Sequence, residues 1–126
     1  MMSGMQQEQQ GDVPWGTQWD LARAADPILG AWSPGRVTLG FQDGRAGGRG
    51  PVNRYFGICH QEADGLRMGP FGMTMMAGPP EAMAAETAFH RLLEQVVGLR
   101  HSEAELVLLD AEGGELMAFV PSADPT

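Results

Sequence analysis

The sequence contains no lysine and only one cysteine, Cys59. Without lysine, the chain cannot form a Schiff base with a substrate, cannot bind a nucleotide through a P-loop lysine and has no lysine general base. With one cysteine, it cannot form an internal disulfide bond. Several enzyme classes are therefore excluded by composition alone.

Positive charge is also scarce, because eight arginines stand against sixteen Asp and Glu residues and give a net charge of -8. Phosphate backbones and anionic membranes repel such a protein, so we predict no nucleic-acid partner. No apolar run approaches the roughly 18 residues of a membrane helix. Residues 1–12 have neither the basic nor the apolar segment of a signal peptide. We expect a cytoplasmic protein without membrane insertion, either a monomer or a weak dimer.

The chain length of 126 residues suits one domain that can bury most of its own core. Residues 1–13 are rich in glutamine and lack apolar periodicity, which is typical of a disordered tail. The predicted domain covers residues 14–121, and residues 122–126 form a second tail.

Strand patterns occupy most of this domain. Val37, Leu39 and Phe41 alternate with smaller or polar residues, as in a half-buried antiparallel strand. Asp43-Gly44 then predicts a tight hairpin turn, because glycine supplies the positive φ that such turns require. Residues 51–60 carry bulky groups on both faces, which favours a central strand. Further strands are expected at residues 17–24, 45–50, 66–68, 71–76, 99–102, 105–110 and 115–120, with turns at 26–27, 33–35, 63–65, 69–70 and 112–114.

One amphipathic helix is expected over residues 81–97. Its apolar residues recur at spacings of three and four, from Met83 to Val97. Pro79 and Pro80 suit the first turn, and Gly98 suits a left-handed residue after the last turn. Many short strands and one such helix predict an α+β, mainly antiparallel β fold, in which the helix packs across a cracked β-barrel or roll.

Landmarks along residues 15–120 resemble the META domain family, the HslJ-like proteins of bacterial heat and envelope stress. The matching stretches are Gly16-Thr-Gln-Trp-Asp-Leu21, Val37-Thr-Leu-Gly-Phe41, Gly50-Pro-Val-Asn-Arg-Tyr-Phe-Gly57, Leu66 to Gly69, Met73-Thr-Met-Met-Ala77, Glu86 with Phe89, and Leu106-Val-Leu-Leu-Asp110. The resemblance implies an open barrel with one helix across it, similar to secretion pilot proteins that shelter a lipid. It implies no established reaction.

Two positions depart from the family pattern. Val52 and Gly78 stand where many members carry cysteine, so the resemblance gives no support for a redox role in this chain. Family members are commonly exported or lipid-anchored and linked to stress, drug tolerance or motility.

The residues that carry the resemblance are interpreted as structural. Asn53 is expected to be a semi-buried amide that joins neighbouring strands, because a buried amide without partners is costly. A role in orienting a ligand is the alternative. The same structural interpretation covers Arg54, Tyr55, Gly57 and Thr74.

Reactive groups are few. Cys59 and His60 should point to opposite faces of a strand, which favours a packed thiol over a thiolate–imidazole pair. Two alternating trios are possible metal ligands or solvated edges, namely His60, Glu62, Asp64 and His101, Glu103, Glu105. On the helix, Glu86, His90 and Glu94 are expected to form an exposed stripe. We predict no catalytic residue, no metal site and no cofactor.

Five methionines gather around the start of the helix: Met68, Met73, Met75, Met76 and Met83. Thioether side chains adapt to varied apolar ligands, although a methionine-rich core is an alternative. The leading hypothesis is a non-enzymatic stress-response or interaction module that binds a small apolar ligand or an unknown protein partner between helix and sheet. The alternatives are a small enzyme or metal-binding protein that uses Cys59 or the His and carboxylate groups, and an accessory domain of a larger complex.

Overall fold

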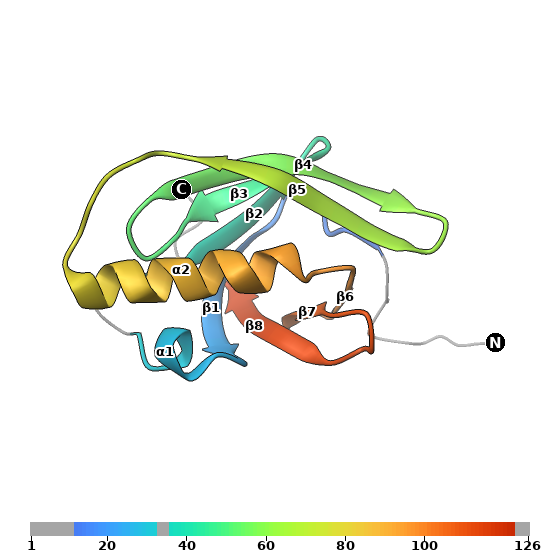
Figure 1. Cartoon of the computed structure of the whole chain (residues 1–126). Helices are drawn as coiled ribbons and strands as arrows, with labels where there is room; N and C mark the ends of the chain where they lie inside the picture. Colours follow the sequence, from blue (N-terminus) through green and yellow to red (C-terminus); the bar gives the residue numbers. More distant parts are fainter. Residues whose placement is uncertain (1–11, 33–35, 123–126) are drawn as a thin grey trace.

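Eight antiparallel strands form one curled sheet, and a long helix lies across its open side (Figure 1). This computed structural model describes residues 12–32 and 36–122. The strands are β1 (Gln18–Ala24), β2 (Thr38–Gln42), β3 (Arg45–Arg49), β4 (Arg54–Glu62), β5 (Gly65–Met73), β6 (Gly98–His101), β7 (Leu106–Leu109) and β8 (Glu115–Pro121), and the helices are α1 (Pro27–Gly30) and α2 (Pro80–Glu94). The predicted fold class is confirmed.

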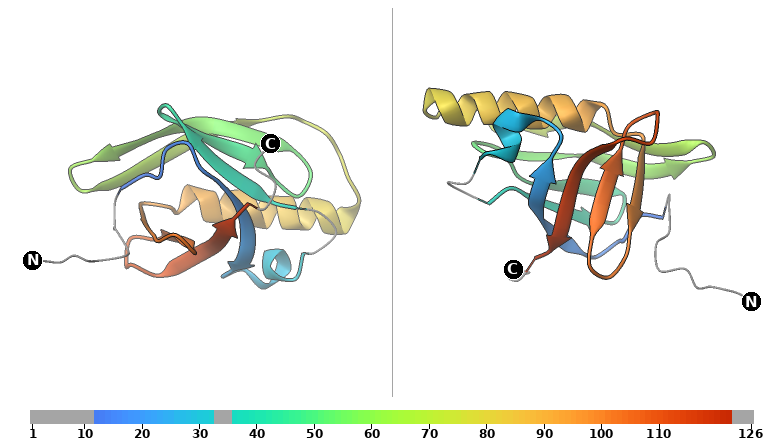
Figure 2. Two further views of the ribbon diagram at one scale, coloured as in Figure 1. Left: turned by 180° about the vertical axis from the view of Figure 1, so that it is seen from behind. Right: turned by 90° about the horizontal axis from the view of Figure 1, so that it is seen from below.

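The sheet has the strand order β5-β4-β3-β2-β1-β8-β7-β6, so β5 and β6 are its two edges. These edges approach each other at one end only, where the Leu66 N–H donates to the Val97 carbonyl at 3.0 Å. Helix α2 covers the remaining opening, as the two views of Figure 2 show. The barrel is therefore closed partly by backbone pairing and partly by the helix.

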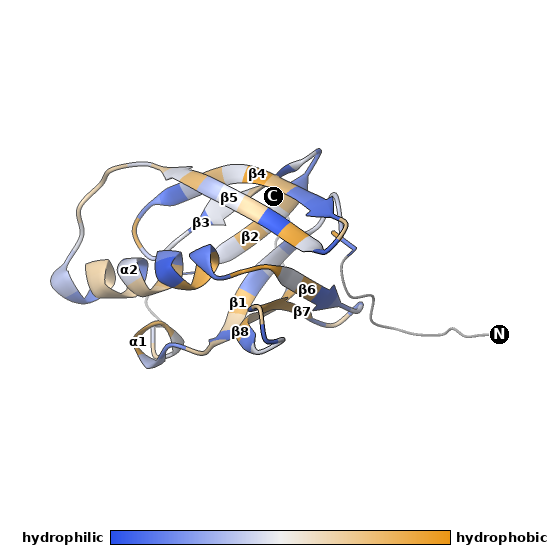
Figure 3. Cartoon of the chain, turned by 45° about the vertical axis from the view of Figure 1, so that its right-hand side comes forward, coloured by the Kyte–Doolittle hydropathy of each residue, from blue (hydrophilic) through white to orange (hydrophobic). Residues whose placement is uncertain are grey.

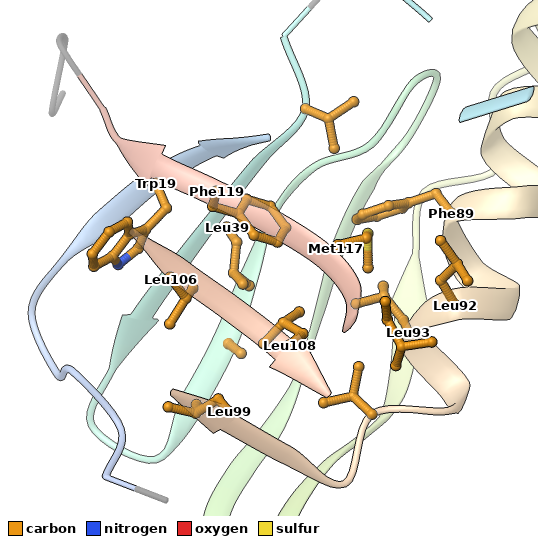
Figure 4. Close-up of a cluster of buried hydrophobic side chains, with 14 of the residues drawn as sticks. Trp19, Leu39, Phe89, Leu92, Leu93, Leu99, Leu106, Leu108, Met117 and Phe119 are labelled. Atoms are coloured by element: carbon orange, nitrogen blue, oxygen red, sulfur yellow. The ribbon is translucent and has the colours of Figure 1, made fainter. Parts of the chain in front are cut away.

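The core lies between α2 and the concave face of the sheet. Phe89, Leu92 and Leu93 of the helix face Leu108, Met117 and Phe119 of β7 and β8 (Figure 4). All six side chains are buried. The alternating polar and apolar colours along α2 in Figure 3 correspond to this one buried stripe. Removing its apolar surface from water is the main force that holds the helix on the sheet.

The hairpin between β2 and β3 is formed as the sequence predicts. Asp43 and Gly44 both have positive φ, 50° and 83°, and the strands pair directly through Gln42 and Arg45. Val37, Leu39 and Phe41 are buried. The turn residues and the period-two pattern of apolar side chains were sufficient to predict this hairpin.

We expect the substitution Gly48→Ala in β3 to destabilise the protein by about 1–3 kcal/mol, the usual cost of overpacking. A Cβ atom at this position would lie 2.7 Å from the Thr38 Oγ1 and closer still to the Thr38 carbonyl oxygen. Urea unfolding measures the effect. Gly40→Ala in β2 is the matched control, because its Cβ would meet nothing nearer than 3.5 Å; equal stability of the two variants would contradict this packing.

Helix α2 ends three residues earlier than predicted. The Val97 N–H donates to Leu109 O at 2.9 Å, and its carbonyl accepts from Leu66, so both groups are used by the sheet edges. The last helical residue is Glu94, followed by the cap Gln95 in a right-handed conformation, and Gly98 begins β6. The expected left-handed glycine cap was wrong because tertiary pairing recruits this segment.

The predicted turn at Gly69-Pro70 was also wrong. Strand β5 continues through this cis peptide bond, and its pairing with β4 shifts register by one residue between Gly57 and Cys59. A β-bulge absorbs the extra residue and bends the strand. Strand β4 has a neighbour on each side, as expected of a central strand, and lies next to the edge strand β5. Only one of its faces is buried, because Phe56 and Ile58 on the outer face are 57% and 55% exposed.

Asp26-Pro27 begins the short helix α1, where only a turn was expected. The Asp26 carboxylate accepts hydrogen bonds from the N–H groups of Ile28 and Leu29, and Pro27 occupies the first turn. The turn predicted at residues 33–35 and most of the two predicted tails lie outside the described residues. Within the described part of the chain, none of the helices is long and apolar enough to cross a membrane.

Candidate functional site

Asn53 lies just before β4 and uses both of its side-chain polar atoms. Its Nδ2 donates to Glu86 Oε2 at 2.9 Å and to Met76 O at 3.2 Å. Its Oδ1 accepts from the Thr74 Oγ1 at 2.8 Å and from the Met76 N–H at 2.7 Å. The side chain is buried, so this satisfied amide joins β4 to the segment that follows β5 and to helix α2.

Glu86 is the helical partner in this network and is only 4% exposed. Its Oε1 accepts from the N–H groups of Val52 at 2.9 Å and Asn53 at 3.3 Å. We call Asn53, Thr74, Met76 and Glu86 the amide network. It fixes the distance between the start of β4 and the first turns of α2.

The burial of Glu86 corrects the prediction of an exposed stripe. His90 is also largely buried, and its Nε2 lies 3.6 Å from Glu86 Oε2, while Glu94 is exposed. The sequence does indicate that Glu86 is buried, because it shares one side of the helix with Ala82, Phe89 and Leu93, at i-4, i+3 and i+7. All three of these side chains face the core. A carboxylate on this buried side of the helix needs a hydrogen-bond donor, and the Asn53 amide supplies one.

Tyr55 and Gly57 fill structural positions behind the network. The Tyr55 hydroxyl donates to Thr38 O at 2.6 Å, and its ring packs edge-on against Phe71 and Phe89. Burial raises the pKa of Tyr55 well above its usual range. A side chain at Gly57 would meet the Phe71 ring at 2.8 Å.

Arg54 and Thr74 connect the neighbouring strand ends. The Arg54 N–H donates to Thr74 Oγ1 at 3.2 Å, so the threonine hydroxyl accepts from Arg54 and donates to Asn53. The Arg54 side chain is exposed on the opposite face of β4.

A groove of about 470 Å³ opens beside the amide network, between α2 and the segment after β5. Four of the five predicted methionines line it; we call this the methionine groove: Met73, Met75, Met76 and Met83, with Asn53, Ala77, Glu86, Thr87, His90, Arg91 and Glu94. Met75 and Met76 are 88% and 61% exposed. Met83 Sδ accepts from the Gly78 N–H at 3.4 Å, which holds this sulfur at the groove wall.

Met68 lies elsewhere. It packs against the core and lines a different hollow, near Gly65 and Val97, where the two sheet edges approach each other. The structure therefore brings four methionines together and separates the fifth.

Cys59 and His60 occupy opposite faces of β4. Cys59 is fully buried, and burial raises its pKa to about 11, whereas His60 is exposed. His60 Nε2 lies 3.2 Å from Glu62 Oε2, which also pairs with Arg67 at 3.3 Å. Among the described residues, no three His, Cys, Asp or Glu side chains are arranged to hold a metal ion.

We expect Cys59 to resist alkylation in the folded protein, because it is both inaccessible and protonated at neutral pH. Iodoacetamide at pH 8 should modify it at the rate of global or local opening, and in urea at the rate of a free thiol. Mass spectrometry of timed samples measures both rates. Rapid modification without denaturant would contradict the buried position.

The two positions that depart from the family pattern are neighbours in space. A Cβ atom built on Gly78 would lie 3.3 Å from Val52 Cγ2. The residues just before β4 therefore lie close to those that precede α2, beside the amide network.

Comparison with solved structures supports the fold. A protein from Burkholderia xenovorans, solved by NMR, superimposes with a TM-score of 0.64 at 24% sequence identity, covering 87% of this chain and 84% of that chain. No curated protein sequence matches. The family model described as META domain matches residues 12–124, nearly the whole chain. The chain therefore belongs to the META domain family.

Proposed function

We propose that this META domain is a non-enzymatic binding module, which takes an apolar ligand or an apolar segment of a protein partner into the methionine groove. The main support for this proposal is that four methionines line one open groove. We further propose that this binding serves a stress response, as the family resemblance suggests.

The groove combines an adaptable wall with a fixed base. Met75 and Met76 are largely exposed, and unbranched thioethers repack around ligands of different shape. Asn53 and Glu86 lie at the base and are held by the hydrogen bonds of the amide network. A fixed base lowers the cost of ordering the site on binding.

The alternative of an enzyme that uses Cys59 has less support. A nucleophilic thiol needs access and a lowered pKa, whereas Cys59 is fully buried and its pKa is raised to about 11. His90 has a carboxylate nearby, but Glu86 already accepts three hydrogen bonds from Val52 and Asn53. These observations favour binding over catalysis.

Two experiments test the groove. Native mass spectrometry of freshly purified protein, followed by lipid extraction, should reveal bound apolar molecules. Titration with oleate should raise the melting temperature, because a ligand that binds only the folded state stabilises it. Repeated recovery of empty protein, together with no thermal shift, would contradict an apolar ligand in this groove.

We expect the double variant Met75→Ser/Met76→Ser to lose most of the oleate-induced thermal shift while it keeps the melting temperature of the free protein. Both side chains are exposed, so their truncation removes ligand contacts and little of the core. Ile28→Ser/Ile58→Ser is the matched control, because these apolar residues are each 55% exposed outside the groove. An equal loss in both double variants would indicate non-specific binding.

A further inference from the structure

A second surface, on the convex side of the sheet, has a floor of glycine. Gln18, Gly40, Gly47 and Phe56 are direct cross-strand partners in β1, β2, β3 and β4. The two glycines place no side chain on this row. Two adjoining hollows of about 390 and 350 Å³ lie over it and share Gln18, Gly40 and Gly47. We call this row the glycine trough.

Arginines stand on both sides of the trough. Arg45 is two residues before Gly47 on β3, and Arg49 is two residues after it. Side chains two apart on a strand share a face and are separated by about 7 Å. Arg54 of β4 is the direct partner of Arg49 and borders both hollows.

These three arginines have no carboxylate partner within residues 12–32 and 36–122, whereas Arg23, Arg36 and Arg67 are each in an ion pair. Arg49 of β3 and Arg54 of β4 are direct partners on neighbouring strands, and like charges directly opposite each other are destabilising. The chain as a whole carries a net charge of -8. Unpaired positive charge is thus concentrated on one face of an acidic protein, where an anion would relieve the repulsion.

Phe56 forms the end wall of the trough. Its ring lies over Gly72 of β5, since a Cβ atom on that glycine would be 2.8 Å from it. Although the Phe56 ring packs over Gly72, the side chain remains 57% exposed. Ile58, the next residue on the same face of β4, is 55% exposed. The arginine walls therefore adjoin an apolar patch.

We propose that the glycine trough binds an extended acidic segment of a protein partner, with an apolar residue against Phe56. The floor spans three strand spacings, about 14 Å, which matches about four extended residues. Alternate side chains of such a segment point to opposite sides, so its carboxylates reach Arg45 on one wall and Arg49 or Arg54 on the other. Guanidinium groups bind carboxylates through paired hydrogen bonds. Nucleic acid fits less well, because a long polyanion is repelled by the net charge.

Fluorescence anisotropy of the full chain with the labelled peptide Asp-Glu-Phe-Glu-Asp tests this proposal. We expect saturable binding at 50 mM salt that is at least about tenfold tighter than binding of the Asn/Gln analogue, and that weakens at 200 mM salt as screening grows. Arg54→Gln should weaken binding by about fivefold or more. Arg67→Gln, at an exposed arginine of β5 outside both the trough and the methionine groove, makes the same change in charge and should change binding less than about twofold.

Filling the trough is a second, independent test. A side chain at Gly40 has room, since its Cβ would meet nothing nearer than 3.5 Å, so Gly40→Leu should fold with an unreduced melting temperature and lose peptide binding. Absence of peptide binding, equal binding of the uncharged analogue, unchanged affinity in Arg54→Gln or Gly40→Leu, or tighter binding of an eight-nucleotide oligothymidylate would each overturn the proposal.

Discussion

Replacing Glu86 by alanine is expected to lower the free energy of unfolding by about 3–5 kcal/mol. The carboxylate accepts from the Val52 N–H, the Asn53 N–H and the Asn53 Nδ2. Truncation leaves two buried donors of Asn53 and one half-buried donor of Val52 without this partner, and each unsatisfied buried group costs about 1–3 kcal/mol. Since a domain of this size has only about 5–15 kcal/mol of stability, urea unfolding should detect a large shift.

Glu94→Ala is the matched control on the same helix, because Glu94 is exposed and outside the amide network. We expect it to change stability by less than about 0.5 kcal/mol. A double-mutant cycle with Asn53→Ala should give a coupling of about 1–3 kcal/mol between Asn53 and Glu86. Equal effects of Glu86→Ala and Glu94→Ala, or additive effects in the cycle, would contradict the network.

A disulfide introduced by Val52→Cys/Gly78→Cys is expected to stabilise the domain by about 2–4 kcal/mol. A sulfur on residue 52 would take the place of a Val52 γ-carbon, one of which lies 3.3 Å from the position that a Cβ atom on residue 78 would occupy. The bond would close the chain around β4 and β5 and so reduce the entropy of the unfolded state. Oxidised and reduced protein should differ in urea midpoint by this amount.

The single variants Val52→Cys and Gly78→Cys serve as controls, because neither gains a nearby thiol partner. Cys59 is buried and should not exchange with the new pair. Thiol counting under denaturing conditions should give one free thiol in the oxidised double variant. Three free thiols after oxidation, or a midpoint unaffected by reduction, would show that residues 52 and 78 are not adjacent in the folded protein.

Local patterns predicted most of the sheet correctly. The β2–β3 hairpin follows from Asp43-Gly44, and the last two strands follow from the apolar runs on either side of the turn at Gly113. Such features depend on residues close in sequence, where turn chemistry and side-chain period decide the conformation. The same reasoning located α2 and its buried stripe.

Predictions failed where distant segments decide the local conformation. The end of α2 depends on Leu66 and Leu109, which take the hydrogen bonds of Val97. The path of β5 through Gly69-Pro70 depends on a bulge in its pairing with β4. The segments that pair with Val97 and with β5 cannot be identified from the sequence around each of them.

The candidate site was predicted in part. Four methionines of the predicted set line one groove, but Met68 does not, and Glu86 was placed on the exposed side of the helix. The role of Glu86 depends on Asn53, 33 residues earlier, whose amide reaches it across the opening of the barrel. A buried carboxylate is recognised from sequence only when its donor is known.

The central claim is that the methionine groove binds apolar ligands while the amide network holds its base. It is tested most directly by NMR of protein labelled with ¹³C at the methionine methyl groups and titrated with oleate. We predict saturable shifts of the Met73, Met75, Met76 and Met83 methyl resonances, with those of Met68 and Met117 unchanged. The claim would be contradicted if the resonance of the buried Met117 also shifted. It would equally be contradicted if the groove methionines showed no shifts at an oleate concentration that saturates the thermal shift.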